Sequence, residues 1–340
     1  MEVIVAETHQ ELSVTDESHV GAARRAARHK AQALGLGSET TARAELVASE
    51  LATNLVKHAG QGGAVLMAGV AGGKEPGLEI IAIDGGPGMR SAETAMQDGF
   101  STSASLGGGL GAIKRLSDQF AIHTRQGRGT AVLSRLWERR RPASRRLSFA
   151  VGGVMVARPG ETVCGDGWAA AYGGDRLTVL VVDGLGHSAP AHQAAKTALE
   201  LFREHCLLPP AELIRAVHER IAHTPGAVMA VARIDRAQGT VTYSGVGNIA
   251  GRIVCRQTSV GCVSTGGLAG YRLGRVREFT YPWADDAVLL MMSDGLVTES
   301  HSTDLEDLSS CPPSLAAAVL YRDFRRPRDD VTVVLVRNAE

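Results

Sequence analysis

The sequence has few aromatic residues and no excess charge of either sign. Phe, Trp and Tyr make up 4% of the 340 residues, and 36 basic residues balance 36 acidic ones. Proteins that bind nucleic acid are usually clearly basic, and those that stack bases need aromatic side chains. The composition therefore predicts that nucleic acid is not a partner.

Cysteines and long apolar runs are also scarce. The five cysteines form no C-x-x-C pair and are odd in number, which is typical of reduced thiols and of neither a disulfide framework nor a zinc site. No apolar run approaches the roughly 20 residues that span a bilayer. The first residues lack the basic start and apolar centre of a signal peptide. We therefore expect a cytoplasmic protein that does not engage a membrane.

The length favours two domains, because domains usually contain about 100–200 residues. Charge marks a boundary: residues 138–148 carry five arginines and one glutamate, whereas residues 1–137 and 149–340 are each mildly acidic. Pro142 and the few apolar residues of this segment predict an exposed stretch. We therefore expect domains at 1–137 and 149–340, joined by a basic linker at 138–148.

The two halves differ in their secondary-structure patterns. Helical spacing at 41–58, an apolar run at 78–83 and a glycine-rich helix start near 107–111 indicate mixed helices and strands in the first half. The second half is rich in strands, with helices expected near 189–206 and 211–222. The expected strands are 149–157, 168–172, 176–182, 227–235, 239–246, 249–256, 286–292 and 331–337.

Polar groups in the first half have the chemistry of a nucleotide site. Glu50 and Asn54 lie four residues apart in the helical segment and so share one face. A carboxylate there can activate a hydroxyl, and the carboxamide oxygen can hold a hydrated Mg²⁺. Asp84 ends the apolar run and precedes Gly-Gly-Pro-Gly, which lets a backbone approach a ligand closely. Each motif alone also fits a solvated helix face or a turn.

A glycine cluster opens the next helical stretch at Gly107, Gly108, Gly109 and Gly111. Helix N-termini that follow glycines bind phosphate groups. The sequence contains no P-loop, and a polar segment stands where a dinucleotide-binding fold needs a strand. The cluster therefore predicts a phosphate site of another kind, with Thr130 at the start of a later strand.

In this order, the motifs resemble the GHKL ATPase and kinase family. The strings ELATNLVKHAGQGG, DGGPGM and STSASLGGGLGAIKRLSDQF resemble its RsbT-type anti-sigma switch kinases. The resemblance implies a Bergerat-type α/β sandwich that binds ATP with Mg²⁺, in which Glu50 is the catalytic base and Asn54 binds the metal. The implied cofactor-binding residues are Asn54, Asp84, Gly86, Gly88, Gly107, Gly108, Gly109, Leu110, Gly111 and Thr130.

Aspartates adjoin the apolar strands of the second half. Asp183 and Asp294 each end an apolar run and precede glycine, Asp166 lies in CGDGW, and Asp329 and Asp330 begin the last run. Strands hold such carboxylates rigidly, and several that converge suit divalent cations. A single Asp-Gly pair is more often a hairpin turn, so the prediction depends on the set.

The ordered set G-D, V-D-G-L-G-H, S-D-G and D-D-x-T resembles the metal-dependent (PPM) serine/threonine phosphatases. CGDGW and YSGVGNI resemble their SpoIIE/RsbX branch. The resemblance implies an α-β-β-α sandwich, and hence an α+β protein of two domains, with two Mn²⁺ or Mg²⁺ ions at one edge. It implies that Asp183 and Asp294 are catalytic and that His187 is either a proton donor or structural. The implied metal ligands are Asp166, Asp183, Gly184, Asp294 and one of Asp329 and Asp330.

Together the resemblances imply a bifunctional regulator of sigma-factor partner switching. The first domain would phosphorylate Ser or Thr of a STAS-domain antagonist or stressosome-like protein, and the second would remove such phosphates. A sigma factor or its regulator, and a second copy of the chain, are further implied partners. Two alternatives stay open at this point. One is a phosphatase controlled by a non-catalytic ATP sensor, and the other is a sigma-regulator-binding module with incidental catalysis.

Overall fold

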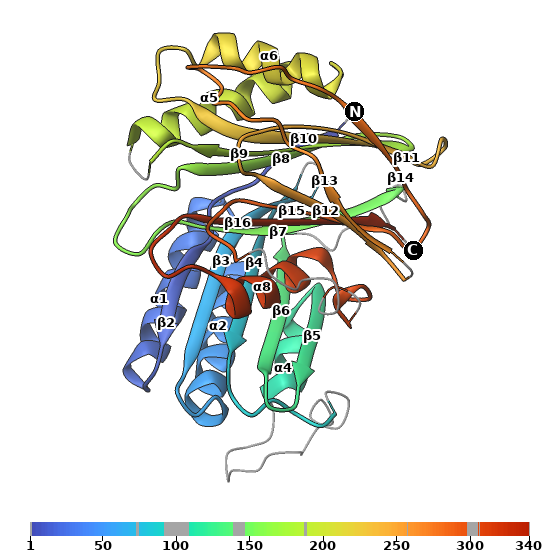
Figure 1. Ribbon diagram of the computed structural model, residues 1–340. Coiled ribbons are helices and arrows are strands. Elements are labelled where there is room, and N and C mark those ends of the chain that lie inside the picture. Colours follow the sequence, from blue (N-terminus) through green and yellow to red (C-terminus); the bar gives the residue numbers. More distant parts are fainter. Residues whose placement is uncertain are drawn as a thin grey trace. The chain divides into compact units, whose positions relative to one another are not determined.

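The chain divides into two units, shown as a ribbon in Figure 1. We call Met1–Thr8 with Arg145–Glu340 the split unit, and His9–Ser144 the inserted unit. No helix in the described part of the chain is long and apolar enough to cross a membrane. The computed structural model describes residues 2–72, 75–91, 109–138, 147–186, 189–256, 258–297, 305 and 307–339.

The split unit is built on two antiparallel sheets. The first sheet contains, in spatial order, β1 (Glu2–Val5), β8 (Asp166–Gly173), β9 (Arg176–Gly184), β10 (Ala227–Asp235), β11 (Thr240–Val246) and β14 (Phe279–Pro282). The second contains β13 (Thr258–Cys262), β12 (Ala250–Cys255), β15 (Val288–Met292), β16 (Val331–Asn338) and β7 (Phe149–Val156). Apolar side chains of both sheets form one core, including Trp168, Tyr243 and Leu289, as in other sandwiches of sheets.

Helices cover the outer faces of the two sheets. α5 (Ala189–His205) and α6 (Pro210–Arg220) pack on β8 to β11, and α8 (Pro313–Phe324) packs on β7 and β16. Buried residues of α5 and α6 meet the first sheet in a second core. The layers are therefore α-β-β-α, which confirms the fold class expected for the second half.

The first residues of the chain belong to the split unit. β1 pairs antiparallel with β8 from Glu2 opposite Tyr172 to Val5 opposite Ala169, and the amide of Ala6 donates to the Trp168 carbonyl at 3.1 Å. Our sequence-based division placed all of residues 1–137 in one domain, and the structure differs for the first eight. A four-residue strand gives little periodicity, and its partner β8 lies more than 160 residues further along the chain.

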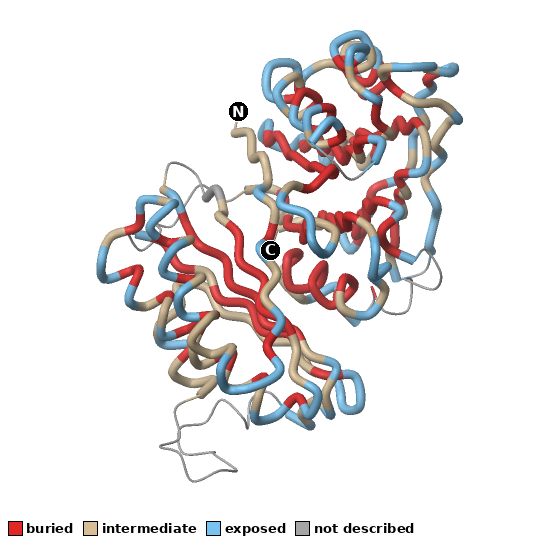
Figure 2. Tube along the Cα trace, turned by 90° about the vertical axis from the view of Figure 1, so that its left-hand side faces the viewer, coloured by how far each residue is buried: buried red, intermediate tan, exposed pale blue. Residues whose placement is uncertain are grey.

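The inserted unit is a five-stranded antiparallel sheet with helices on one face. Its strands, in spatial order, are β2 (Gln10–Val14), β3 (Gly63–Gly72), β4 (Glu75–Asp84), β6 (Gly129–Trp137) and β5 (Gln119–Arg125). The helices are α1 (Ser18–Ala33), α2 (Ser38–His58) and α4 (Gly109–Leu116). Alternate residues of the central strands, such as Leu78 and Ile80, pack against Val47 and Leu51 of α2. Figure 2 shows these buried segments in red.

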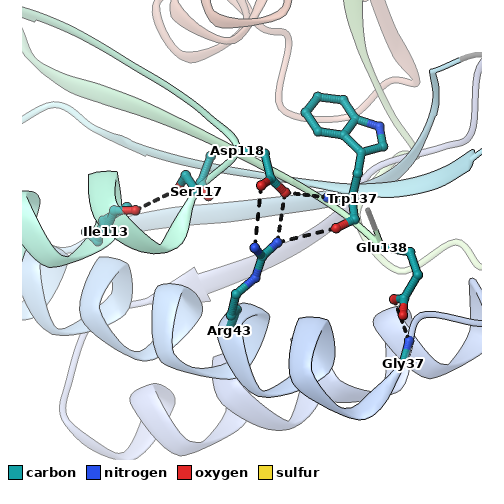
Figure 3. A network of polar contacts seen from close by, with 8 residues as sticks. Gly37, Arg43, Ile113, Ser117, Asp118, Trp137 and Glu138 are labelled. Atoms are coloured by element: carbon teal, nitrogen blue, oxygen red, sulfur yellow. Dashed lines mark hydrogen bonds and ion pairs between the residues drawn. The ribbon is translucent and has the colours of Figure 1, made fainter. Parts of the chain in front are cut away.

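A polar network fixes α2 to the strands, as Figure 3 shows. The Arg43 guanidinium donates to both oxygens of Asp118, the shorter contact being 2.8 Å, and the Trp137 amide donates to Asp118 at 2.8 Å. At the start of α2, the Gly37 amide donates to the Glu138 carboxylate at 2.7 Å, where a negative charge is favourable. Glu138, which we expected in the linker, thus bonds to the inserted unit. Residues 139–146 lie outside the described residues.

Candidate active sites

In the inserted unit, α2 brings the predicted kinase residues toward the start of α4. Glu50 and Asn54 are half-buried and lie beside the buried stripe of α2. A Cβ placed on Gly109 would lie 3.4 Å from Asn54 Oδ1, so the first residue of α4 lies next to this amide. The positive end of the α4 dipole and the Asn54 oxygen are thus close together, which suits a phosphate group with its metal.

The end of β4 forms the second wall of this site. Asp84 Oδ1 accepts hydrogen bonds from the Gly86 amide at 2.8 Å and from the Thr130 amide at 3.3 Å. A Cβ on Gly86 would lie 2.8 Å from Cα of Ala59, the C-cap of α2. The predicted residues Asp84, Gly86 and Thr130 are therefore brought together beside the end of the helix that carries Glu50.

Gly88 is fixed by its backbone. It adopts φ +65°, and a Cβ there would lie 2.2 Å from the Arg125 carbonyl oxygen, so only glycine fits. Gly129 is constrained in the same way, with φ +83° and a Cβ position 1.9 Å from the Asp84 carbonyl oxygen. Sequence reasoning assigned a role to Gly88 and missed Gly129. Two glycines around Arg128 in the turn were the available signal.

Thr124 is a second residue that the sequence analysis missed. It lies opposite Thr130 in the β5–β6 hairpin, and the two hydroxyl oxygens are 3.1 Å apart. The Met89 amide donates to the Thr124 hydroxyl at 2.8 Å. Thr124 thus ties the Gly88 turn to the strand that carries Thr130. Two threonines flanking a glycine-rich hairpin were the signal that could have found it.

Of the five predicted cofactor-binding residues at 107–111, the structure describes three. Gly109, Leu110 and Gly111 lie in the first turn of α4 and are half-buried. Leu110 packs against the apolar core of the inserted unit. Gly107 and Gly108 lie outside the described residues.

In the split unit, the predicted aspartates come from the ends of strands in both sheets. Asp166 begins β8 and lies directly opposite Asp183 near the end of β9. Asp294 follows β15, and Asp329 and Asp330 precede β16. Directly opposed side chains of antiparallel strands lie about 5 Å apart at Cβ, so the fold brings like charges together at this edge.

Burial and crowding shift the pKa values of these carboxyl groups. Burial, together with the charges of Asp166, Asp294 and others, raises the pKa of Asp183 to about 9. Burial raises the pKa of Asp166 to about 7, although a hydrogen bond from Ser293 opposes the shift. Burial and Asp294 raise the pKa of Asp329 as well. The cluster therefore holds negative charge at a cost that a bound cation would remove.

Two side chains outside the predicted set orient the cluster. The buried Ser293 hydroxyl donates to Asp166 Oδ2 at 2.6 Å and accepts from the Thr332 amide at 2.9 Å. The side-chain Nδ2 of Asn248 donates to Asp294 Oδ2 at 2.8 Å. Asn248 lies within YSGVGNI and Ser293 within S-D-G, strings that resemble the phosphatases, but neither residue was predicted to have a role.

Asp329 and Asp330, which the sequence left as alternatives, differ in their surroundings. Both oxygens of Asp330 accept backbone hydrogen bonds, from Arg158 and from Gly165, each at 2.7 Å. The Asp329 carboxylate accepts one bond, from the Asp330 amide at 3.0 Å, and is less buried than Asp330. Asp330 thus uses both of its carboxylate oxygens to hold backbone amides. His187 lies outside the described residues.

The donor set fits divalent cations, although it is not arranged as a finished cage. Among the described residues, no group of three or more His, Cys, Asp or Glu side chains is placed to hold a metal ion. Asp166, Asp294 and Asp330 instead bond to neighbouring groups of the chain. The oxygen donors of the crowded carboxylates nevertheless match the all-oxygen chemistry that Mg²⁺ and Mn²⁺ prefer.

Comparison with known proteins assigns a family to each unit. Residues 13–135 match the Histidine kinase-like ATPase domain family, and residues 173–339 match Stage II sporulation protein E (SpoIIE). The serine/threonine-protein kinase RsbT of Bacillus subtilis (strain 168) is 40% identical over 126 residues, which cover 37% of this chain and 94% of RsbT. The chain belongs to the RsbT family through its inserted unit. With the SpoIIE match, the chain resembles a fusion of an RsbT-type domain and a SpoIIE-type phosphatase domain.

Further comparisons concern the SpoIIE-type domain. The phosphoserine phosphatase RsbX of Bacillus subtilis (strain 168) is 22% identical over 184 residues, or 53% of this chain and 90% of RsbX. A solved structure of RsbX in complex with magnesium has a TM-score of 0.51 and 18% identity, covering 58% of this chain and 98% of that one. A structure described as "The bacterial stressosome: a modular system that has been adapted to control secondary messenger signaling" has a TM-score of 0.52 and 26% identity, covering 56% of this chain and 99% of that one.

The matched ranges agree with the way the units are built. The match to the Histidine kinase-like ATPase domain family, at residues 13–135, contains Glu50, Asn54, Asp84 and Thr130, and it leaves out β1. The RsbT-type domain thus interrupts a SpoIIE-type domain after its first strand.

Proposed function

We propose that this chain is a bifunctional switch enzyme in a sigma-factor partner-switching pathway. The RsbT-type domain would transfer the γ-phosphoryl group of ATP to a serine or threonine of a STAS-domain or stressosome-type protein, and the SpoIIE-type domain would remove it. Two placements support the proposal: Asn54 of α2 lies beside the first residue of α4, and Asp166 lies opposite Asp183 in the β8–β9 pairing. A sigma factor or its regulator, and a second copy of the chain, belong to the same proposal as partners.

In the RsbT-type domain, the residues present fit ATP with Mg²⁺. Asn54 would hold the metal beside the start of α4, and Asp84 would accept a hydrogen bond from the adenine amino group. Bound Mg²⁺ neutralises phosphate charge, and catalysis in phosphoryl transfer is mostly positioning and electrostatic stabilisation. Glu50, one turn before Asn54 on the same helix, would take the proton of the attacking hydroxyl.

In the SpoIIE-type domain, we assign the metal ligands to Asp166, Asp183, Asp294, Asp329 and the Gly184 carbonyl. Bound divalent metals would polarise the phosphoryl group and activate water. Asp330 is assigned a structural role, because both of its oxygens already accept backbone amides. Through the Gly165 amide it holds the segment that leads directly into Asp166.

The kinase activity is tested with the full chain, labelled ATP and a purified STAS-domain antagonist. We expect label to appear on a serine or threonine of the antagonist, and Glu50→Gln to abolish transfer while ATP still binds. Glu39→Gln is the matched control, since Glu39 is exposed in the first turn of the same helix. ATP binding without transfer by the wild-type chain would contradict the kinase and favour a non-catalytic ATP sensor.

The phosphatase activity is tested with the same antagonist, labelled in advance, and Mn²⁺ or Mg²⁺. We expect metal-dependent loss of label, abolished by Asp183→Asn and retained in Asp285→Asn, a substitution of an exposed aspartate before β15. If Asp183→Asn left both hydrolysis and signalling unchanged, the chain would instead be a binding module with incidental catalysis.

A further inference from the structure

A basic turn projects from the split unit near the edge that carries the aspartate cluster. The segment Ser264–Glu278 contains three arginines and one glutamate, although residues 149–340 as a whole are mildly acidic. Arg272, Arg275 and Arg277 are all exposed, and no ion pair among the described residues involves them. The one acidic side chain, Glu278, is used elsewhere, because it accepts the Ala211 amide of α6 at 2.9 Å.

The tip of this turn presents an aromatic side chain to solvent. Tyr271 is 81% exposed, and Leu185, which follows Gly184, is 54% exposed. Tyr271 is the most exposed large apolar side chain of the described residues, and Leu207, at 74%, and Leu46, at 55%, rank between it and Leu185. Tyrosine and arginine are the side chains most enriched at the energetic centres of protein interfaces.

The turn is held rigidly by backbone hydrogen bonds. Leu268 and Arg272 exchange both amide–carbonyl bonds at 3.0 Å, and the Gly270 amide donates to His218 Nδ1 of α6 at 2.8 Å. Gly270 adopts φ +86°, and a Cβ there would lie 2.9 Å from Ile221. Ordering of the turn therefore costs little on binding, because its conformation is already fixed.

Buried and exposed side chains are interspersed from Arg272 to Arg277. Val276 belongs to the core between the first sheet and its helices, and Leu273 packs against that core, whereas Arg272, Arg275 and Arg277 are exposed. The Val276 carbonyl accepts from Arg215, and the Arg277 carbonyl accepts from the Ser244 hydroxyl at 2.9 Å. The positive charges are thus displayed on a fixed backbone.

The sheet places this turn close to the aspartate cluster. Ala269 and Ala227 exchange both backbone hydrogen bonds at 2.9 Å, and Ala227 is the partner of Gly184 in the β9–β10 pairing. Two neighbouring-strand steps of about 4.8 Å separate Ala269 from Gly184, or roughly 10 Å in all. An extended peptide covers that distance in about three residues.

We propose that the basic turn, at residues 268–277 of the segment Ser264–Glu278, docks an acidic peptide segment that flanks the phosphorylated residue of the protein substrate. Tyr271 supplies the apolar contact, and Arg272, Arg275 and Arg277 attract the acidic side chains. The inference rests on the proposed phosphatase function, for which it names the substrate feature that this surface selects. An acidic protein segment fits this surface, because the fixed aromatic side chain and the separated arginines lie within a few residues' reach of the catalytic edge.

The test measures dephosphorylation of two phosphoserine peptides by the full chain in the presence of Mn²⁺. One peptide has glutamates three and four residues from the phosphoserine, and the other has glutamines at those positions. We expect a lower KM for the acidic peptide. Arg272→Gln with Arg275→Gln should raise that KM about fivefold, since exposed charge pairs each contribute about 0.2–1 kcal/mol. The kcat and the hydrolysis of p-nitrophenyl phosphate should be unchanged. Arg203→Gln, at an exposed arginine of α5, is the control.

Binding is measured separately from hydrolysis, so that a failure of the docking proposal can be distinguished from a failure of the phosphatase proposal. Fluorescence anisotropy of labelled, unphosphorylated versions of the peptides, in EDTA, should show binding of the acidic peptide that Tyr271→Ala and the double arginine variant weaken. Equal binding of both peptides, or equally tight binding of a single-stranded oligonucleotide, overturns the docking proposal. Absence of metal-dependent hydrolysis overturns the phosphatase instead.

Discussion

A buried ion-pair row in the RsbT-type domain allows a quantitative stability prediction. Glu79 of β4 is 1% exposed, accepts from Arg135 Nε at 2.6 Å and lies 3.1 Å from His9 Nε2. Arg135 is the partner of Glu79 in the β4–β6 pairing, and Ala68 is its partner on the other side. The small Ala68 side chain leaves room for His9 to reach across the sheet.

The lowered pKa of Glu79 gives the size of its contribution to the free energy of unfolding. Burial alone would raise this pKa, but Arg135 and His9 outweigh burial and lower it from 4.5 to about 2. Such a shift corresponds to about 3 kcal/mol of stability. Because the folded-state pKa is depressed, the contribution is fully present above pH 4.5 and is lost as the pH falls toward 2.

We expect Glu79→Gln to destabilise the RsbT-type domain by about 3 kcal/mol at neutral pH, because it leaves the half-buried Arg135 guanidinium without its counter-charge. Hydrogen exchange followed by mass spectrometry reports on β4 and β6 separately from the other domain. Amides there that exchange by unfolding of the domain should exchange roughly a hundredfold faster in the variant. The difference should shrink when exchange is measured below pH 4.

The matched control is Glu75→Gln, at the first residue of the same strand, because the Glu75 side chain forms no hydrogen bond or ion pair with the described residues. It should leave exchange in β4 and β6 within about threefold of wild type. If Glu79→Gln behaved like this control, the row from His9 to Arg135 would contribute no net stability and the reasoning would be refuted.

Three further predictions follow from the same structure. Deleting Glu2–Val5 should expose β8 as an edge strand, so exchange in β8 should accelerate and phosphatase activity fall while nucleotide binding persists; unchanged exchange would contradict the pairing. Ser293→Ala removes the donor to a buried carboxylate and should cost about 1–3 kcal/mol in urea unfolding, with weaker Mn²⁺ binding by calorimetry; wild-type values in both measurements would refute it. Gly88→Ala should weaken binding of a fluorescent ATP analogue at least about tenfold, given the clash with the Arg125 carbonyl, whereas Gly60→Ala, at φ +73° in open space, should not.

Much of the fold could be predicted from the sequence, and the misses have physical reasons. The helix expected at 41–58 is observed at Ser38–His58, and the strand expected at 331–337 is observed at Val331–Asn338, because their apolar periodicities are long and clear. α8 was missed because its residues from Pro313 to Tyr321 are buried without interruption, which leaves no 3.6-residue alternation to read. β1 was missed because it is short and pairs with a distant strand.

The candidate sites divide in the same way. Residue types and their local spacing indicated Glu50 with Asn54, and the aspartates that end strands. Partnerships between distant residues were not visible: Ser293 bonds to Asp166 across 127 residues, and Asn248 to Asp294 across 46. The assignment of Asp330 as an anchor likewise needed the positions of the Arg158 and Gly165 amides.

The sequence by itself determined that two families are joined in this chain, because each carries its motifs as local strings in a fixed order. Only the tertiary structure decided how they are joined. The first strand completes the sheet of the SpoIIE-type domain, so the RsbT-type domain is an insertion rather than a preceding module. Strand pairing is a contact between distant segments and depends on backbone hydrogen bonds that any residue can form. For that reason the letters of β1 did not reveal its partner, whereas its register against β8 does.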